Sequence, residues 1–207
     1  MNIILIPAYE PSETLINLIK DLKTYPIGPI IVIDDGSGSD YKHIFQHVSD
    51  LGCILFTHPH NMGKGAAIKS GIIEAQKNFK DITSYITCDA DGQHLPKDIF
   101  ALHEATKDNP NELILGVRKH RQKGIPFKSK IGNIFSSFYF RLSTGVACPD
   151  TQTGLRAIPY HLTQDALNVT ENRYDYEMVF LTRHAKSGKP IRFIQIDTIY
   201  IEQNQSS

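Results

Sequence analysis

The sequence predicts a three-layer α/β fold with a mostly parallel central sheet. Short apolar runs alternate with segments of helical periodicity over residues 1–117. Residues 30–33 are apolar throughout, which is typical of a strand buried on both faces of a sheet. Repetition of strand and helix in this way favours helices on both sides of a parallel sheet.

The first half of the chain supplies most of these elements. Leu15, Leu18, Ile19 and Leu22 recur at the spacing of one helix face, residues 67–75 repeat that pattern, and residues 99–106 give a weaker third case. The apolar runs that separate these helices are expected to be strands. They cover residues 2–8, 29–33, 52–57, 84–88 and 112–117.

After residue 117 the alternation stops. Residues 118–130 are polar and basic, with Gly124 and Pro126, and are expected to form a loop. Residues 130–143 and 174–187 are expected to be helices, the second ended by Gly188 and Pro190. An alternating strand over residues 191–201 follows. We expect one domain, 1–207.

Composition limits the possible functions. The 207 residues are 41% hydrophobic and carry a formal net charge of zero, so no overall field favours nucleic acid as a partner. The three cysteines form no Cys-x-x-Cys pair and are expected to be free thiols. Pro7 interrupts the first apolar run, which predicts a strand and not a signal peptide. No run approaches the roughly 18 apolar residues of a spanning helix.

Carboxylates follow a buried strand at Asp89 and Asp91. Ligands of an open parallel sheet bind beyond the carboxyl ends of its strands, so these acids should lie at the rim, beside Asp34. Paired carboxylates with Gln93 as a further oxygen donor suit Mg²⁺ or Mn²⁺ shared with substrate phosphates. The alternative is a turn, which Asp-Gly sequences favour.

Two other loops are rich in glycine. Asp34 and Asp35 precede Gly36 and would either form an Asx turn or accept hydrogen bonds from a base or ribose. Lys64 lies between Gly63 and Gly65 at the start of a helix, where an anion could bind. Neither loop completes a Walker motif or Gly-x-Gly-x-x-Gly, which disfavours an ATPase or a dehydrogenase.

Six segments in order resemble glycosyltransferase family 2, the inverting enzymes of the GT-A fold, and most closely the polyprenyl- and dolichyl-phosphate sugar synthases. Each motif alone is weak, but the ordered set is specific. The matching segments are Ile6-Pro7-Ala8-Tyr9-Glu10, Val32-Ile33-Asp34-Asp35-Gly36-Ser37, Asn61-Met62-Gly63-Lys64-Gly65, Asp89-Ala90-Asp91-Gly92-Gln93, Gly116-Val117-Arg118 and Asp150-Thr151-Gln152-Thr153-Gly154-Leu155-Arg156.

The resemblance implies a UDP- or GDP-sugar donor, a polyprenyl phosphate acceptor and Mg²⁺ or Mn²⁺ as cofactor. It implies a nucleotide-sugar-binding half at 1–117, an acceptor-binding half at 118–207 and four groups of site residues. Nucleotide-sugar-binding residues would be Pro7, Ala8, Tyr9, Glu10, Asp34, Asp35, Lys64, Asp89, Ala90 and Asp91. Metal ligands would be Asp89, Asp91 and Gln93. Acceptor-phosphate residues would be Arg118, Ser136, Thr153 and Arg156, and catalytic residues Asp91, Arg118, Asp150 and Arg156.

One departure from the family concerns the general base. Many family members carry a Glu-Asp pair in a late helix, whereas residues 174–177 here are Tyr-Asp-Tyr-Glu. A phosphate acceptor is already ionised and needs no base, so the departure favours a lipid phosphate. With a hydroxyl acceptor, as in the synthesis of surface polysaccharide, Asp150 or Glu177 would be the base.

The segment 113–149 contains seven Lys or Arg and no Asp or Glu. It runs into a Phe-rich amphipathic helix, a combination typical of a helix on an anionic membrane surface. The alternative is that Phe135 and Phe138 pack on the sheet. We expect a cytoplasmic protein, peripheral or anchored at the inner face of the membrane, and a soluble portion of a longer chain.

Two other functions compete with this interpretation. A nucleotidyltransferase also uses paired carboxylates with Mg²⁺, but it needs a basic, Gly-rich loop after the first strand, where this chain has residues 7–11, Pro-Ala-Tyr-Glu-Pro. A non-catalytic nucleotide-sugar-binding module would need neither intact carboxylates nor a basic acceptor segment.

Overall fold

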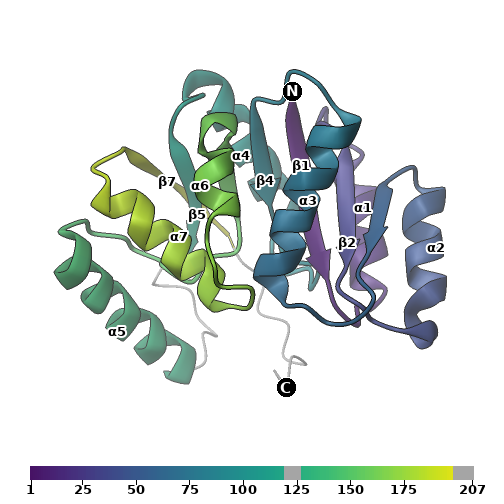
Figure 1. Ribbon diagram of the computed structural model, residues 1–207, viewed down its shortest axis with the longest axis horizontal. Helices are drawn as coiled ribbons and strands as arrows, with labels where there is room; N and C mark the ends of the chain where they lie inside the picture. Colours follow the sequence, from purple (N-terminus) through teal and green to yellow (C-terminus); the bar gives the residue numbers. More distant parts are fainter. Residues whose placement is uncertain (119–126, 198–207) are drawn as a thin grey trace.

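The computed structural model describes residues 1–118 and 127–197, without the side chains of residues 127–135. In this part of the chain a seven-stranded sheet has the order β3-β2-β1-β4-β6-β5-β7, and helices cover both of its faces (Figure 1). The predicted three-layer α/β fold is therefore confirmed. The sheet lies across the middle of the molecule, with β3 and β7 at its edges.

Most neighbouring strands are parallel. β1 pairs in parallel with β2 and β4, β2 with β3, and β5 with β7, whereas β6 is antiparallel to both of its neighbours. The sequence did not predict β6, because its four residues are too short for a clear pattern. The strands are β1 (Asn2–Ala8), β2 (Ile30–Asp34), β3 (Ile54–Thr57), β4 (Ser84–Thr87), β5 (Leu113–Arg118), β6 (Arg156–Pro159) and β7 (Ile191–Ile196).

Two apolar cores lie on opposite faces of the sheet. Alternate residues of β1 face them, with Ile3 and Leu5 in one core and Ile4 and Ile6 in the other. α1 (Thr14–Leu22), α2 (Lys42–Asp50) and α4 (Pro96–Asp108) contribute to the core of Ile4. The near side in Figure 1 carries α3 (Lys64–Asn78), α6 (Thr163–Leu167) and α7 (Asp175–Lys186), which contribute to the core of Ile3.

The helix α5 (Phe127–Thr144) lies outside α7, at the edge of the molecule (Figure 1). Of its described side chains, Phe140 is buried in the core of Ile3, whereas Phe138 is 62% exposed. Phe138 therefore does not pack on the sheet, as one sequence interpretation expected. The side chain of Phe135 lies outside the described residues.

Element boundaries differ from expectation mainly after residue 117. The helix expected at 130–143 begins earlier, at Phe127. Residues 119–126, which belong to the expected loop, lie outside the described part. The strand expected at 191–201 ends at Ile196, and residues 198–201 are likewise not described. No helix in the described residues has the length and apolar character needed to span a membrane. The three cysteines are free, as predicted, and all three are buried.

Candidate active site

A polar cleft of about 630 Å³ opens at the carboxyl ends of β1, β2 and β4. Convergence of these strand ends follows from their parallel pairing. Nine of the ten residues predicted to bind a nucleotide sugar line the cleft, and Asp34 is the exception. The full lining is Pro7, Ala8, Tyr9, Glu10, Pro11, Ser12, Asp35, Asn61, Gly63, Lys64, Asp89, Ala90, Asp91, Arg173 and Tyr174.

The loop after β1 forms one wall of the cleft. Glu10 has a φ of 48°, a left-handed conformation that is uncommon outside glycine. Its backbone N–H donates to Ser37 Oγ at 2.8 Å, which ties this loop to the loop after β2. The neighbouring Tyr9 is 49% exposed and also lines the cleft.

Asp34 and Asp35 have different roles although they are adjacent. Asp34 is buried, and its Oδ1 accepts a hydrogen bond from the N–H of Ser37 at 2.8 Å, so its carboxylate stabilises the turn. Asp35 lines the cleft and accepts from the backbone N–H groups of Met62 at 2.9 Å and Gly63 at 2.8 Å. Of the two alternatives that the sequence allowed for this pair, an Asx turn or a ligand contact, Asp34 therefore forms the turn.

The buried side chain of His58 contacts the carboxylate of Asp35. Its Nδ1 lies 2.7 Å from Asp35 Oδ1, and its Nε2 lies 2.8 Å from the Ser70 hydroxyl on α3. Because Asp35 receives a hydrogen bond from Gly63 as well, this buried chain fixes the carboxylate and the start of α3 together. Sequence reasoning included His58 only as part of a polar loop.

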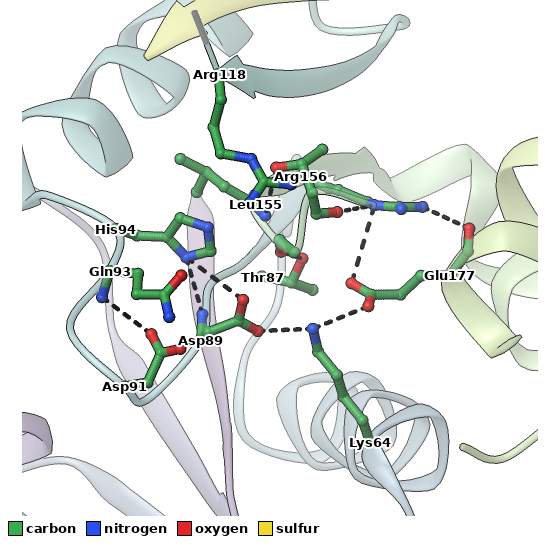
Figure 2. A network of polar contacts seen from close by, with 12 residues as sticks. Lys64, Thr87, Asp89, Asp91, Gln93, His94, Arg118, Leu155, Arg156 and Glu177 are labelled. Carbon is green, nitrogen blue, oxygen red and sulfur yellow. Dashed lines mark hydrogen bonds and ion pairs between the residues drawn. The ribbon is translucent and has the colours of Figure 1, made fainter. Parts of the chain in front are cut away.

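Lys64 connects the two halves of the chain (Figure 2). Its ammonium lies 2.6 Å from Asp89 Oδ1, at the end of β4, and 2.8 Å from Glu177 Oε2 on α7. Burial by itself would lower the pKa of Lys64, but the carboxylates of Asp89 and Glu177 outweigh it and raise that pKa. In turn, despite its burial, the charges of Lys64 and His94 lower the pKa of Asp89 to about 2. The expected anion-binding lysine is thus already paired with two carboxylates.

Among the side chains that the structure describes, none forms such an ion pair with Asp91. Its Oδ1 accepts from the Gln93 N–H at 2.9 Å, and burial raises the pKa of its carboxyl group. Among the described residues there is no group of three His, Cys, Asp or Glu that could hold a metal ion by itself. This arrangement fits Mg²⁺ or Mn²⁺, which bind through one or two carboxylates and take further oxygens from substrate phosphates.

Gly154 allows Asp89 to lie close to the backbone of the acceptor half. A Cβ at this position would lie 2.4 Å from Asp89 Oδ2, so any other residue here would have to displace the Asp89 carboxylate. The Thr87 hydroxyl donates to the Gly154 carbonyl at 2.9 Å and fixes the same contact from β4. The glycine of the segment 150–156 is therefore required by packing against the cleft.

The predicted acceptor-phosphate residues lie beside the cleft and outside its lining. Arg118 forms a two-point ion pair with the buried Asp150, with Nη2 3.0 Å from Oδ1. Arg156 is 1% exposed, and its guanidinium donates to the carbonyls of Thr151, Thr153 and Glu177. Ser136 Oγ lies 2.8 Å from Thr151 Oγ1. In this arrangement Arg156 joins the segment 151–153 to α7 (Figure 2).

The family model described as glycosyl transferase family 2 matches residues 3–165 of the chain. The chain belongs to this family. Family membership supports glycosyltransferase activity, and it agrees with the resemblance inferred from the six motifs.

Curated relatives of this glycosyltransferase include two named for dolichyl phosphate. A UDP-N-acetylglucosamine–dolichyl-phosphate N-acetylglucosaminyltransferase of Methanococcus voltae is 28% identical over 98% of this chain and 87% of the relative. A dolichyl-phosphate β-glucosyltransferase of Trichomonas vaginalis is 25% identical over 88% of this chain and 56% of the relative. An uncharacterized protein of Methanocaldococcus jannaschii is 30% identical over 98% of this chain and 83% of the relative.

Solved structures confirm the GT-A fold of the glycosyltransferase. Glucosyl-3-phosphoglycerate synthase of Mycobacterium tuberculosis, in complex with Mn²⁺, UDP and glucosyl-3-phosphoglycerate, superposes with a TM-score of 0.66. The match covers 97% of this chain and 72% of the synthase at 14% identity. The same enzyme with phosphoglyceric acid gives a TM-score of 0.70.

Arg173 and Tyr174 line the cleft of the glycosyltransferase but were not among the predicted site residues. They directly precede α7, which the sequence predicted correctly as a helix. The available signal was positional, because a polar segment leads into a helix in the half that was expected to bind an acceptor. Nothing in the pattern indicated that this segment would reach the loop of Lys64.

Proposed function

We propose that this glycosyltransferase transfers a sugar from a nucleoside-diphosphate sugar to a polyprenyl phosphate, such as dolichyl phosphate, with inversion at the anomeric carbon. The names of two relatives, from Methanococcus voltae and Trichomonas vaginalis, support this acceptor class. The donor is a UDP- or GDP-sugar, bound in the cleft between the loop after β1 and Asp91.

The observation that carries the proposal is the state of the two candidate bases. Asp150 is bound to Arg118 by two hydrogen bonds, and Glu177 is paired with Lys64. A sugar hydroxyl would require a carboxylate free to accept a proton, and both are engaged by cations. A phosphate monoester, with a second pKa of about 6, is already a nucleophilic anion at neutral pH.

The reaction is a single displacement. An acceptor phosphate oxygen forms a bond to the anomeric carbon as the bond from that carbon to the diphosphate oxygen breaks. The nucleoside diphosphate leaves with the bonding electrons, and no proton transfer is needed. Most of the rate enhancement then comes from positioning and from stabilisation of the leaving diphosphate.

Asp91 would hold the divalent ion, with Gln93 beside it, and the ion would neutralise the departing diphosphate. Asp89 keeps its place through Lys64, and Asp35 through His58, so both carboxylates are held in position before substrate arrives. Arg118 and Arg156 fix the segment 150–156, and we place the acceptor phosphate beside this segment.

The acceptor is a lipid, so the enzyme must work at a membrane surface, and we propose the cytoplasmic face. On α5, Phe138, Tyr139 and Leu142 are 62%, 73% and 70% exposed. At helical spacing these three share one side, away from the buried Phe140. An amphipathic helix with exposed aromatic residues, in a segment without acids, suits an anionic lipid surface.

The test is a transfer assay with purified protein, radiolabelled UDP- and GDP-sugars, Mn²⁺ and a short-chain polyprenyl phosphate. We expect a lipid-linked sugar that forms only with a nucleotide sugar and the metal. Release of free sugar alone, or binding of the nucleotide sugar without any transfer, would contradict the proposal.

The second candidate is transfer to a sugar hydroxyl in the synthesis of surface polysaccharide. Family membership alone allows it, and it predicts that Glu177→Gln or Asp150→Asn abolishes turnover with an oligosaccharide acceptor. The phosphate-acceptor proposal predicts that neither variant changes the pH dependence of transfer to polyprenyl phosphate.

A further inference from the structure

We infer that Arg173, at the edge of the cleft, binds a phosphoryl group of the substrate. This inference rests on the proposed function but assigns a residue that neither the motifs nor the family resemblance singled out. Arg173 is exposed, lines the cleft and directly precedes α7. Across residues 1–118 and 136–197, no carboxylate forms an ion pair with its guanidinium.

The other basic side chain that lines the cleft is already neutralised. Lys64 lies between Asp89 and Glu177, at 2.6 and 2.8 Å. The lining also contains the carboxylates of Glu10, Asp35 and Asp91. An anionic diphosphate or phosphate entering so acidic a cleft needs cationic partners. In the described part of the cleft, Arg173 is the cation that remains available.

The backbone around Arg173 is held firmly. The carbonyl of Asn172 accepts from the Ala66 N–H at 3.0 Å, in the first turn of α3. Lys69 Nζ donates to the carbonyls of Val169 at 2.7 Å and Glu171 at 3.0 Å. It also donates to Asn172 Oδ1 at 2.6 Å. The segment 169–172 is thus fixed on α3, which places Arg173 before any ligand is bound.

Gly63 lets the stem of Arg173 approach the loop of the cleft. A Cβ on Gly63 would lie 2.8 Å from Arg173 Cγ and 2.5 Å from the Asn172 carbonyl oxygen. The same glycine donates its N–H to Asp35 and begins α3. Arg173 therefore packs its stem against the loop that carries Lys64, and the exposed residue contributes to the lining of the cleft.

A guanidinium suits a phosphoryl group because its planar fork of N–H donors matches two phosphate oxygens. Lysine supplies only a point charge, and a neutral side chain supplies neither charge nor fork. We therefore expect a graded effect, in which Arg173→Lys retains part of the binding and Arg173→Met loses it. Arg183→Met is the matched control, since this arginine on α7 donates to the Asn168 carbonyl outside the cleft.

The experiment is calorimetric titration of the full chain with UDP, GDP, uridine and inorganic pyrophosphate, each with Mn²⁺. Arg173→Met should weaken binding of the nucleoside diphosphates and pyrophosphate by roughly tenfold or more, as loss of a charge-assisted hydrogen bond implies. Uridine binding should stay unchanged. Unchanged affinity for UDP, GDP and pyrophosphate in Arg173→Met, with unchanged KM values for both substrates, would overturn the inference. Equal losses for uridine and UDP would do so too, because they indicate distortion of the cleft.

Two sources of the phosphoryl group are separated by steady-state kinetics. A raised KM for the nucleotide sugar assigns Arg173 to the donor diphosphate. A raised KM for the polyprenyl phosphate, with unchanged UDP affinity, assigns it to the acceptor phosphate. If the wild-type protein binds pyrophosphate through Arg173 but neither UDP nor GDP, the proposed function fails and this inference stands.

Discussion

The ammonium of Lys64 lies 2.6 Å from Asp89 Oδ1, so one of the two carboxylates expected to share a metal ion already has a cation beside it. Asp91, two residues further on, has no cationic side chain paired with it in the described part of the chain and carries the burial cost of its charge. Asp89 and Asp91, which sequence reasoning treated as equivalent metal ligands, therefore have different electrostatic environments. Asp89 is fixed by the protein, and Asp91 is the carboxylate open to a divalent ion.

Replacing Lys64 by Met should destabilise the fold. It leaves Asp89 and Glu177 partly buried without their shared counterion, and removal of one partner of a buried pair costs about 3 kcal/mol or more. Urea unfolding measures the change. Lys77→Met is the control, because Lys77 is 63% exposed in its pair with Glu74, and such pairs contribute about 1 kcal/mol at most. Equal, small losses in both variants would show that Lys64 is not structural.

Replacing Asp91 by Asn should separate stability from function. The change removes an unpaired, partly buried charge, so the free energy of unfolding at neutral pH should stay the same or rise. The increase in Tm that UDP and Mn²⁺ together give to the wild-type protein should disappear. Asp40→Asn, at an exposed position, should keep it. A full Mn²⁺-dependent shift in Asp91→Asn would exclude this residue as a metal ligand.

Much of the cleft could be predicted because parallel strands bring their following loops to one rim. Glu10, Asp35 and Asp91 follow three different strands, and apolar runs alone located those strands. The same reasoning could not separate Asp34 from Asp35. Which of two adjacent acids forms the turn and which faces the cleft depends on the backbone geometry at the strand end.

The acceptor half was harder to predict because its contacts join distant segments. Arg156 looks like a ligand for phosphate in a polar motif, yet β6 carries it into the interior, where three carbonyls surround it. Glu177 reaches Lys64 from another helix. A pattern of local periodicity contains no information on such pairings, and family resemblance supplied the motif without the geometry.

Stability should fall in mild acid because burial lowers the pKa of two histidines, His103 and His184. Burial lowers the pKa of His103, where Asn2 Nδ2 lies 3.2 Å from Nδ1, and burial lowers the pKa of His184 on α7. The neighbours of His103 have smaller effects: Glu104 raises its pKa, whereas Lys107 and the N-terminus lower it. The folded state therefore binds a proton less readily than the unfolded state, whose histidines titrate near a pKa of about 6.5.

The stabilisation from both histidines is complete above a pH of about 6.5 and is lost as the pH falls through the lower, folded-state pKa values. Chemical unfolding at about pH 7.5, 6.5 and 5.5 measures this loss, and each histidine contributes at most about 1.4 kcal/mol per pH unit. His103→Gln should reduce the slope, and His43→Gln, at an exposed position, should not. The same slope in wild type and His103→Gln would contradict the assignment.

The exposed side of α5 should be needed for contact with lipid and dispensable for folding. Phe138 and Leu142 are 62% and 70% exposed, so changing both to Ser removes little buried apolar area and should leave Tm nearly unchanged. Binding to vesicles with anionic lipid should weaken roughly tenfold or more, since each buried large apolar side chain contributes about 1.5 kcal/mol or more. Vesicle co-sedimentation measures this. Tyr160→Ser is the control, because Tyr160 is 47% exposed in a 3₁₀ turn outside α5. Unchanged sedimentation of the double variant would rule out this face as the membrane contact, and transfer to a water-soluble short-chain acceptor should survive the substitutions.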